Sequence, residues 1–313
     1  MQVDLEKIKE TLFENPTVRR RIVHDYGLSR EPTNPKDLAS ELLQQFEQTP
    51  VDRPLEQTLT NREVFRAAVK ALASNSRPWS VFLKREGQLC NLLGGYDCVH
   101  VHDALARGAL SLDKIKSCLP GQSSSGDARA ILRWAQLLVD VDPYYVFVQD
   151  LGRAFRKRSA ESSSESLSDD DLLLCIVGFL GYPPTRWAGA RYLTASGAPL
   201  HREQQKLPGM GYTLASEFLR NLRWSGFKPD RHIQRLLNLW LPEGTSAFQG
   251  KVTQLTLLLG RKSRDLHTYL TYSLLGRSVA PDGVPLSHVD NLIWLLGAYV
   301  EKKGRESDRE YLL

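Results

Sequence analysis

Apolar side chains recur every three or four residues through most of this 313-residue chain, and this spacing constrains the fold more than any other feature. Residues three and four apart share one face of an α-helix, so each stripe predicts a helix with one buried face. Such stripes begin at Leu5, Ile131, Leu172, Phe248 and Val289. Residues 96–102 and 144–148 are rich in strand-forming residues, but neither run has a partner hairpin with a clear turn, and both are also compatible with a helix. We therefore expect an all-α protein of a dozen or more helices.

The composition is that of an ordinary globular protein. Hydrophobic residues make up 42% of the chain and charged residues 25%, which excludes an intrinsically disordered chain. The 41 lysines and arginines exceed the 36 acidic residues by 5. This mild basic excess permits binding to a phosphate backbone without requiring it. At about 150 residues per domain, the length predicts two domains or subdomains.

Two polar stretches are candidate linkers. Residues 121–126 read GQSSSG and are typical of a flexible loop, and residues 162–171 are polar and acidic. The end of the second stretch also has the pattern of a helix start, since Ser168 can cap a helix and the aspartates after it favour the positive helix end. We place a domain boundary near residue 165. The helical region 1–164 has no assigned role, and region 165–313 carries the motifs discussed below.

The cysteines and histidines show no spacing typical of a metal site. Cys90, Cys98, Cys118 and Cys175 include no CxxC pair and are interpreted as reduced thiols of an intracellular protein. No cysteine follows residue 175, so a C-terminal four-cysteine iron–sulfur cluster is excluded. The close His/Asp group at residues 100–103 lacks further ligands. We therefore expect no metal centre built from these side chains.

The sequence also lacks the signals of secretion or membrane insertion. The N-terminal segment is amphipathic and charged, without the apolar stretch of a signal peptide. The longest apolar run, at residues 172–180, is far too short to span a bilayer. We expect an intracellular protein, in the cytoplasm and nucleoid or in the nucleus, with no membrane partner.

The most informative segment is residues 201–240. A short polar helix over residues 202–207 is predicted to end at Pro208, where Gly209 and Gly211 permit backbone angles closed to other residues. A second helix is predicted to follow, which gives a helix-hairpin-helix over residues 202–224. Asp230 then occupies the N-cap position of a third helix, over residues 230–240.

A Gly-x-Gly turn in front of a helix has a specific physical use. The turn exposes backbone N–H groups at the positive end of the helix, and together they can hold a phosphate. This contact reads no bases, so it anchors nucleic acid without sequence preference. Residues 201–231 contain six cationic and three acidic side chains, which gives this segment a net charge of +3. Candidates for phosphate contacts are Lys206, Arg220, Arg223 and Arg231, although a solvated helix face has the same pattern.

Residues 207–211 (LPGMG), followed by residues 229–233 (PDRHI) and Arg235, resemble the helix-hairpin-helix DNA glycosylase superfamily. Its members carry an LPGVG-type hairpin and, some twenty residues later, a V-D-x-H-[VI] motif with the catalytic aspartate. The close match covers about 35 residues, and a looser match in helix pattern extends over residues 170–300. The resemblance implies an all-α fold with a helix-hairpin-helix glycosylase-like core and an additional N-terminal helical region.

By position, the resemblance assigns Asp230 as the catalytic aspartate. The predicted contacts to the DNA backbone are Leu207, Gly209, Gly211, Thr213, Lys206 and Arg231. In the family a monovalent cation often assists the hairpin, which here implies Na⁺ or K⁺ at residues 207–212 and no other cofactor. Bifunctional members place a lysine nucleophile two positions after the second hairpin glycine, where this chain has Thr213. This departure implies a monofunctional enzyme that uses water as its nucleophile.

The chemistry follows from the charge that develops in the reaction. Breaking an N-glycosidic bond leaves an oxocarbenium-like sugar, which a carboxylate stabilises while it activates a water molecule. The target base must first leave the stack. The expected function is removal of a damaged or mispaired base from double-stranded DNA in base excision repair, with no protein partner predicted. Two alternatives stay open: a hairpin protein that binds DNA without cutting a bond, and a helical interaction protein with no nucleic-acid role.

Other polar and aromatic residues near the motif have simpler interpretations. His232 is expected to be structural. Several aromatic side chains could stack on an extruded base, but their helical spacing is more typical of a core. These are Tyr182, Trp187, Tyr192, Phe218 and Trp224.

Overall fold

The computed structural model describes residues 1–28, 35–45, 50–73, 79–140, 143–162, 167–182, 206–301, 311 and 312. Within these ranges the chain is helical, and the only strand-like pairing is a single antiparallel bridge between Val3 and Leu312. The all-α prediction is confirmed, and both runs with strand character are taken up largely by helices. In the same ranges, no helix is both long enough and apolar enough to cross a membrane.

The chain divides into two compact units that alternate along the sequence. Unit 1 comprises Met1–Asp52, Arg223–Leu257 and Arg261–Leu313, and unit 2 comprises Arg53–Leu222 and Leu258–Gly260. The boundary expected near residue 165 therefore does not coincide with the division between units. It falls inside unit 2, between two helices that pack against each other, α9 (Tyr144–Ser162) and α10 (Asp169–Gly181).

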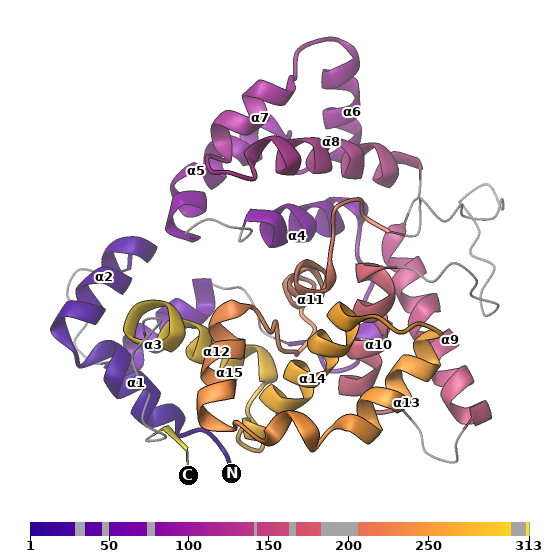
Figure 1. The fold of residues 1–313 in the computed structure, drawn as a ribbon. Coiled ribbons are helices and arrows are strands. Elements are labelled where there is room, and N and C mark those ends of the chain that lie inside the picture. Colours follow the sequence, from indigo (N-terminus) through magenta and orange to yellow (C-terminus); the bar gives the residue numbers. More distant parts are fainter. Residues whose placement is uncertain are drawn as a thin grey trace. The chain divides into compact units, whose positions relative to one another are not determined.

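Unit 1 joins the two ends of the chain. Its helices are α1 (Leu5–Phe13), α2 (Pro16–Tyr26), α3 (Pro35–Gln45), α12 (Arg231–Trp240), most of α13 (Gln249–Leu259), α14 (Arg264–Val279) and α15 (Leu286–Leu295), with the turns η3 (Gly244–Ser246) and η4 (Leu296–Val300). The N–H of Val3 donates to the carbonyl of Val279 at 2.7 Å, and the N–H of Asp4 to that of Tyr311 at 2.7 Å. Helix α15 packs against both α1 and α12 (Figure 1). These contacts explain why the N-terminal helices share a unit with the C-terminal ones.

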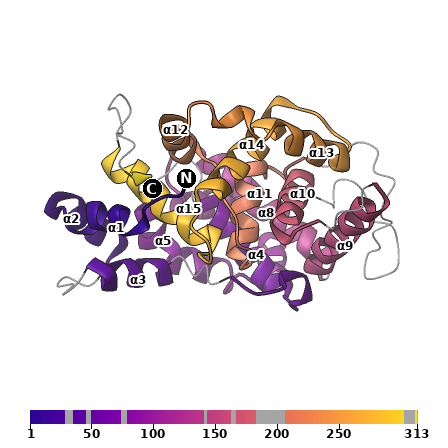
Figure 2. The same ribbon diagram turned by 90° about the horizontal axis from the view of Figure 1, so that it is seen from below.

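Unit 2 contains the helices of the middle of the chain. They are α4 (Asn61–Ala73), α5 (Trp79–Leu92), α6 (Cys98–Ala106), α7 (Leu112–Cys118), α8 (Ser124–Asp140), α9, α10 and α11 (Tyr212–Asn221), with the short turn η1 (Pro54–Glu56). Helix α11 packs against α4 and α10, and α9 and α10 lie side by side (Figure 2). Phe65, Trp134, Phe179 and Phe218 are buried in these helices, which supports the interpretation of Phe218 as a core residue.

Side-chain caps mark several helix starts that the sequence predicted. Ser168 caps α10 by accepting the N–H of Asp171 at 3.2 Å, and Asp230 caps α12. The predicted loop at residues 121–126 is shorter than expected, because α8 already begins at Ser124. Ser123 donates its hydroxyl to the Asp127 carboxylate at 2.7 Å and so stabilises this earlier start. Of the predicted helix at 202–207, residues 202–205 lie outside the described residues, as do Trp187 and Tyr192.

Candidate functional sites in the two units

The predicted phosphate-binding hairpin lies in unit 2, directly before α11. Leu207 and Met210 are buried, whereas Gly209 and Gly211 are exposed. The N–H of Met210 donates to the carbonyl of Leu207 at 3.1 Å and closes the turn. The indole of Trp134, on α8, donates to the carbonyl of Pro208 at 2.8 Å. The loop is thus fixed to the core of unit 2 through its apolar residues, and its glycines face solvent.

The two hairpin glycines differ in how strongly they require glycine. Gly209 has φ +82°, in the left-handed region that favours glycine. Gly211 has φ −86° and ψ 179°, an extended conformation that other residues also adopt. Gly211 is the N-cap residue of α11, and it has no side chain that could accept the N–H groups of the first turn. The N-cap residue of this helix therefore offers its first N–H groups no side-chain acceptor of its own.

Three of the predicted contacts to the DNA backbone take different positions in unit 2. Thr213 is partly exposed in the first turn of α11. Leu207 has its side chain in the core, so it can offer only its main chain to a ligand. The ammonium of Lys206 donates to the carbonyl of Gly181, at the end of α10, and lies 5.2 Å from the centre of the Tyr182 ring. Lys206 thus has partners within its own unit.

Arg220 is not available for a phosphate. Its side chain is 1% exposed and forms an ion pair with Glu217 at 3.0 Å, one turn away on α11. The cause is burial: Arg220 lies on a face of α11 that is covered by the other helices of unit 2, where its charge needs a partner. Arg223 and Arg231 are exposed, and both belong to unit 1.

Helix α8, which contacts the hairpin through Trp134, carries an exposed basic residue that the sequence did not single out. A Cβ placed on Gly209 would lie 3.9 Å from the Cβ of Ala130 on this helix. Arg133 lies three residues after Ala130 and directly before Trp134, so it is close to the part of α8 under the hairpin. Its side chain is exposed and makes no ion pair among the described residues. Arg133 is 76 positions from Gly209 in the sequence, and no local pattern connects them.

Asp230, the predicted catalytic residue, lies in unit 1 at the start of α12. Its Oδ1 accepts the N–H groups of His232 at 2.8 Å and Ile233 at 3.2 Å. Its Oδ2 accepts the indole N–H of Trp294, on α15, at 2.9 Å. A carboxylate has about four acceptor positions, so Oδ2 keeps one open. The partly exposed carboxylate is held in one orientation and can accept one further hydrogen bond.

His232 connects α12 to the turn η4. Its Nδ1–H donates to the carbonyl of Gly297 at 3.1 Å, which makes Nε2 the acceptor nitrogen of a neutral ring. Burial lowers the pKa of His232 below its usual value of 6.5, with a smaller contribution from nearby Arg231 and Arg235, while Asp230 and the Gly297 carbonyl oppose the shift. Arg235 also donates to the carbonyl of Gly297, at 2.6 Å. These contacts agree with the structural role expected for His232.

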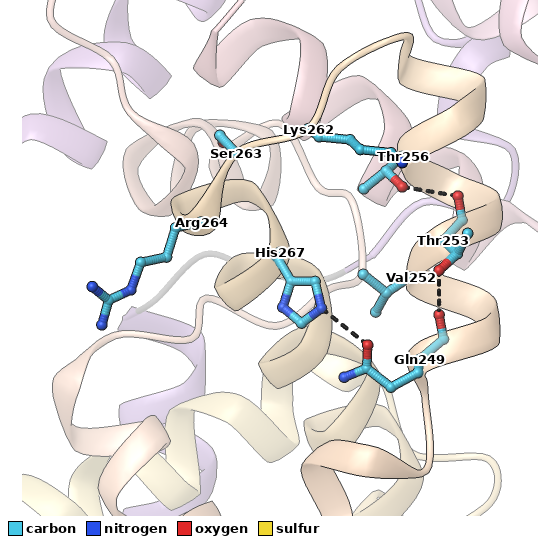
Figure 3. Close-up of a pocket in the computed structure, with 8 residues that line it drawn as sticks. All are labelled: Gln249, Val252, Thr253, Thr256, Lys262, Ser263, Arg264 and His267. Carbon is cyan, nitrogen blue, oxygen red and sulfur yellow. Dashed lines mark hydrogen bonds between the residues drawn. The ribbon is translucent and has the colours of Figure 1, made fainter.

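A separate pocket of about 480 Å³ lies in unit 1, between α13 and the start of α14. Its polar lining includes Gln249, Thr253, Lys262 and His267 (Figure 3). His267 Nε2 lies 3.2 Å from the side-chain oxygen of Gln249. Figure 3 shows the Arg264 guanidinium pointing away from the other labelled side chains. None of the predicted site residues lines this pocket.

Backbone carbonyls of the hairpin are the candidate ligands for the expected Na⁺ or K⁺. The carbonyls of Leu207 and Pro208 each accept a hydrogen bond from the protein. Each can still offer its second lone pair to an ion, and the cation stays a prediction. Among the described residues, no three His, Cys, Asp or Glu side chains are grouped so that they could hold a metal ion, those at residues 100–103 included.

Comparison with known proteins gives no assignment. No protein-family model matches the chain, and no curated protein or solved structure is significantly similar to it. The likeness to the helix-hairpin-helix glycosylases therefore rests on the hairpin and on the residues around Asp230.

Proposed function

We propose that this protein is a monofunctional DNA N-glycosylase, which removes a damaged or mispaired base from double-stranded DNA. The observation that carries the proposal is the state of the Asp230 carboxylate. Three hydrogen-bond donors fix it, no lysine or arginine of the described residues forms an ion pair with it, and Oδ2 keeps one acceptor position. A residue that only caps a helix needs one of its two oxygens.

The carboxylate has two tasks in the proposed reaction. As the bond between C1′ and the base breaks, the base takes the electron pair and positive charge develops on the sugar, which the negative carboxylate stabilises. A water molecule then forms the new bond to C1′, and the open position on Oδ2 orients that water and accepts its proton. The departing base gains a proton, so the net reaction is hydrolysis. Thr213 cannot form a Schiff base, which favours water over a covalent intermediate.

The hairpin supports double-stranded DNA as the partner. It presents the exposed backbone of Gly209 and Gly211 directly before the positive end of α11, an arrangement that favours a phosphate oxygen. Arg133 is an exposed cation on α8, the helix whose Trp134 indole donates to the Pro208 carbonyl of the hairpin. Such a contact recognises the DNA backbone alone. The specificity for one base would depend on other residues.

The test is base release from duplex oligonucleotides that each carry one lesion or mismatch, with alkali added afterwards to cleave abasic sites. Wild type is compared with Asp230→Asn, since asparagine also caps helices well and should preserve the fold. Asp97→Asn is the matched control, because Asp97 caps α6 with the same pair of backbone bonds, at 2.9 and 3.2 Å. We expect release from one lesion class that Asp230→Asn loses and Asp97→Asn retains.

Each other outcome has a distinct meaning. Strand cleavage without alkali would contradict the monofunctional assignment. Salt-sensitive duplex binding without release from any lesion would instead favour the non-catalytic DNA-binding protein. No affinity for DNA even at low salt would favour an interaction protein with no nucleic-acid role.

A further inference from the structure

We infer that Trp294 is a positioning residue for Asp230: its indole N–H holds the carboxylate so that the open acceptor position on Oδ2 is available to the attacking water. The inference rests on the proposed glycosylase function. Trp294 lies 64 residues after Asp230 and outside every motif that the sequence analysis singled out. Its contact is a 2.9 Å hydrogen bond from Nε1 to Oδ2.

The bond to Trp294 is not needed for capping. The N–H groups of His232 and Ile233 already satisfy the cap through Oδ1. With Oδ1 alone engaged, the carboxylate could rotate about its Cβ–Cγ bond and exchange its two oxygens. A donor fixed on a second helix prevents this rotation. The result is one defined oxygen position on which a water can be oriented.

Helix α15 holds the segment before α12 from one face. Asp290 and Trp294 are four residues apart, so they share that face of α15. The Asp290 carboxylate, 1% exposed, accepts the N–H of Lys228 at 2.8 Å, and the Trp294 indole donates to Asp230. One hydrogen bond thus holds each end of residues 228–230. The distance between α15 and the start of α12 is fixed at two points.

The position of the indole is fixed in turn by its neighbours. The Trp294 ring packs edge-on against the His232 ring, with centroids 6.0 Å apart and an interplanar angle of 73°. Three residues later, Gly297 allows close approach to α12: a Cβ there would lie 3.1 Å from the Cβ of His232. Gly297 belongs to η4, a turn of π-helix, which is a rare element that occurs frequently at functional sites.

The chemical nature of the donor also suits the proposed reaction. A lysine or arginine in the place of Trp294 would hold the carboxylate but would neutralise the charge that must face the developing cation. The indole is a neutral donor at every pH and has no acceptor of its own. It orients Asp230 and leaves the negative charge in place.

The first arm of the test is Trp294→Phe, which keeps an aromatic ring and removes the N–H. The matched control is Trp240→Phe, the same change at a buried tryptophan of unit 1 that packs on Tyr311 with ring centroids 6.1 Å apart. In single-turnover assays on the substrate of the wild type, we expect Trp294→Phe to lower the rate of base release about tenfold to a hundredfold. Its duplex Kd should stay within about twofold of wild type. Trp240→Phe should lower thermal stability and leave the rate of the folded protein unchanged.

The second arm is spectroscopic and does not depend on activity. The indole N–H resonance of Trp294 is assigned by its loss in Trp294→Phe. It should move upfield in Asp230→Asn, where a neutral oxygen replaces the carboxylate, and stay in place in Asp97→Asn. Equal rates of base release by Trp294→Phe and Trp240→Phe would overturn this inference and leave the proposed function intact. A Trp294 indole resonance that does not shift in Asp230→Asn would have the same meaning. A wild type that releases no base from any lesion would overturn the proposed function first, and this inference with it.

Discussion

Two consecutive helices of this chain, α11 and α12, begin in opposite electrostatic states. Helix α11 has Gly211 as its N-cap residue, which brings neither a side-chain acceptor nor a charge to the first N–H groups. Helix α12 has Asp230 as its N-cap residue. The Oδ1 of Asp230 accepts two of the first N–H groups of α12, and its carboxylate brings a negative charge to this helix start. The first start favours an anion, and the second presents one.

This difference assigns two steps of the proposed reaction to two units. A phosphate of DNA is the anion that a helix start with a glycine N-cap, such as that of α11 in unit 2, can hold. An oxocarbenium-like sugar is the cation that a carboxylate such as Asp230, in unit 1, can stabilise. The comparison therefore predicts a separation of effects: changes at the hairpin should act on affinity, and changes at Asp230 should act on the chemical step.

The largest expected effect is that of Asp230→Asn at saturating duplex. We expect the single-turnover rate to fall about a hundredfold to a thousandfold, the range typical of losing one electrostatic stabiliser, while duplex affinity is kept. Asp230→Ala should lose the rate as well and also about 1 kcal/mol of stability, because alanine cannot cap the helix. Thermal unfolding and single-turnover kinetics measure the two quantities separately. A parallel loss of rate in Asp97→Asn would erase the distinction between a capping and a catalytic aspartate.

The sequence predicted those features of the two helix starts that depend on neighbouring residues in the chain. The glycine spacing placed the hairpin, and the N-cap pattern placed Asp230 at the start of α12, because both depend on residues adjacent in the chain. It did not predict Trp294 or Arg133, since each reaches its position through the packing of a distant helix. It also gave Arg220 as a phosphate candidate, because periodicity cannot show which face of α11 is buried. The units were missed for the same reason, as unit 1 joins segments from opposite ends of the chain.

The next effect separates the two glycines of the hairpin. Gly209→Ala puts a side chain at φ +82°, which costs about 1 kcal/mol or more, and the loop must shift to relieve the strain. We expect duplex affinity to fall about tenfold, with the rate at saturation unchanged. Gly211→Ala is the control, because its extended backbone accepts alanine and no atom lies within 4 Å of the added Cβ. Fluorescence anisotropy on one labelled duplex measures both, and equal losses would show that strain at Gly209 is not the cause.

A smaller effect is expected at Arg133, on the helix under the hairpin. If it neutralises one phosphate, Arg133→Gln should reduce the slope of log affinity against log salt by about one unit. Arg107→Gln is the control, since Arg107 is also exposed in unit 2 but lies at the end of α6. Anisotropy titrations at several salt concentrations give both slopes. An unchanged slope in Arg133→Gln, with intact binding, would confine the phosphate contact to the hairpin itself.

The smallest effect concerns His232, two residues after Asp230, and it should appear in stability alone. Burial, Arg231 and Arg235 lower the pKa of His232, whereas Asp230 and the Gly297 carbonyl raise it, and the net shift is downward from 6.5. The unfolded chain therefore takes up a proton first as the pH falls through about 6.5, so this group destabilises the fold progressively below that pH. His232→Asn keeps an N–H donor for the Gly297 carbonyl and removes the titration. The drop in Tm between pH 7 and pH 5 should be smaller in His232→Asn than in wild type. A drop of equal size in the two proteins would mean that His232 is hydrated in solution, and that the contact between α12 and η4 is looser than its 3.1 Å hydrogen bond implies.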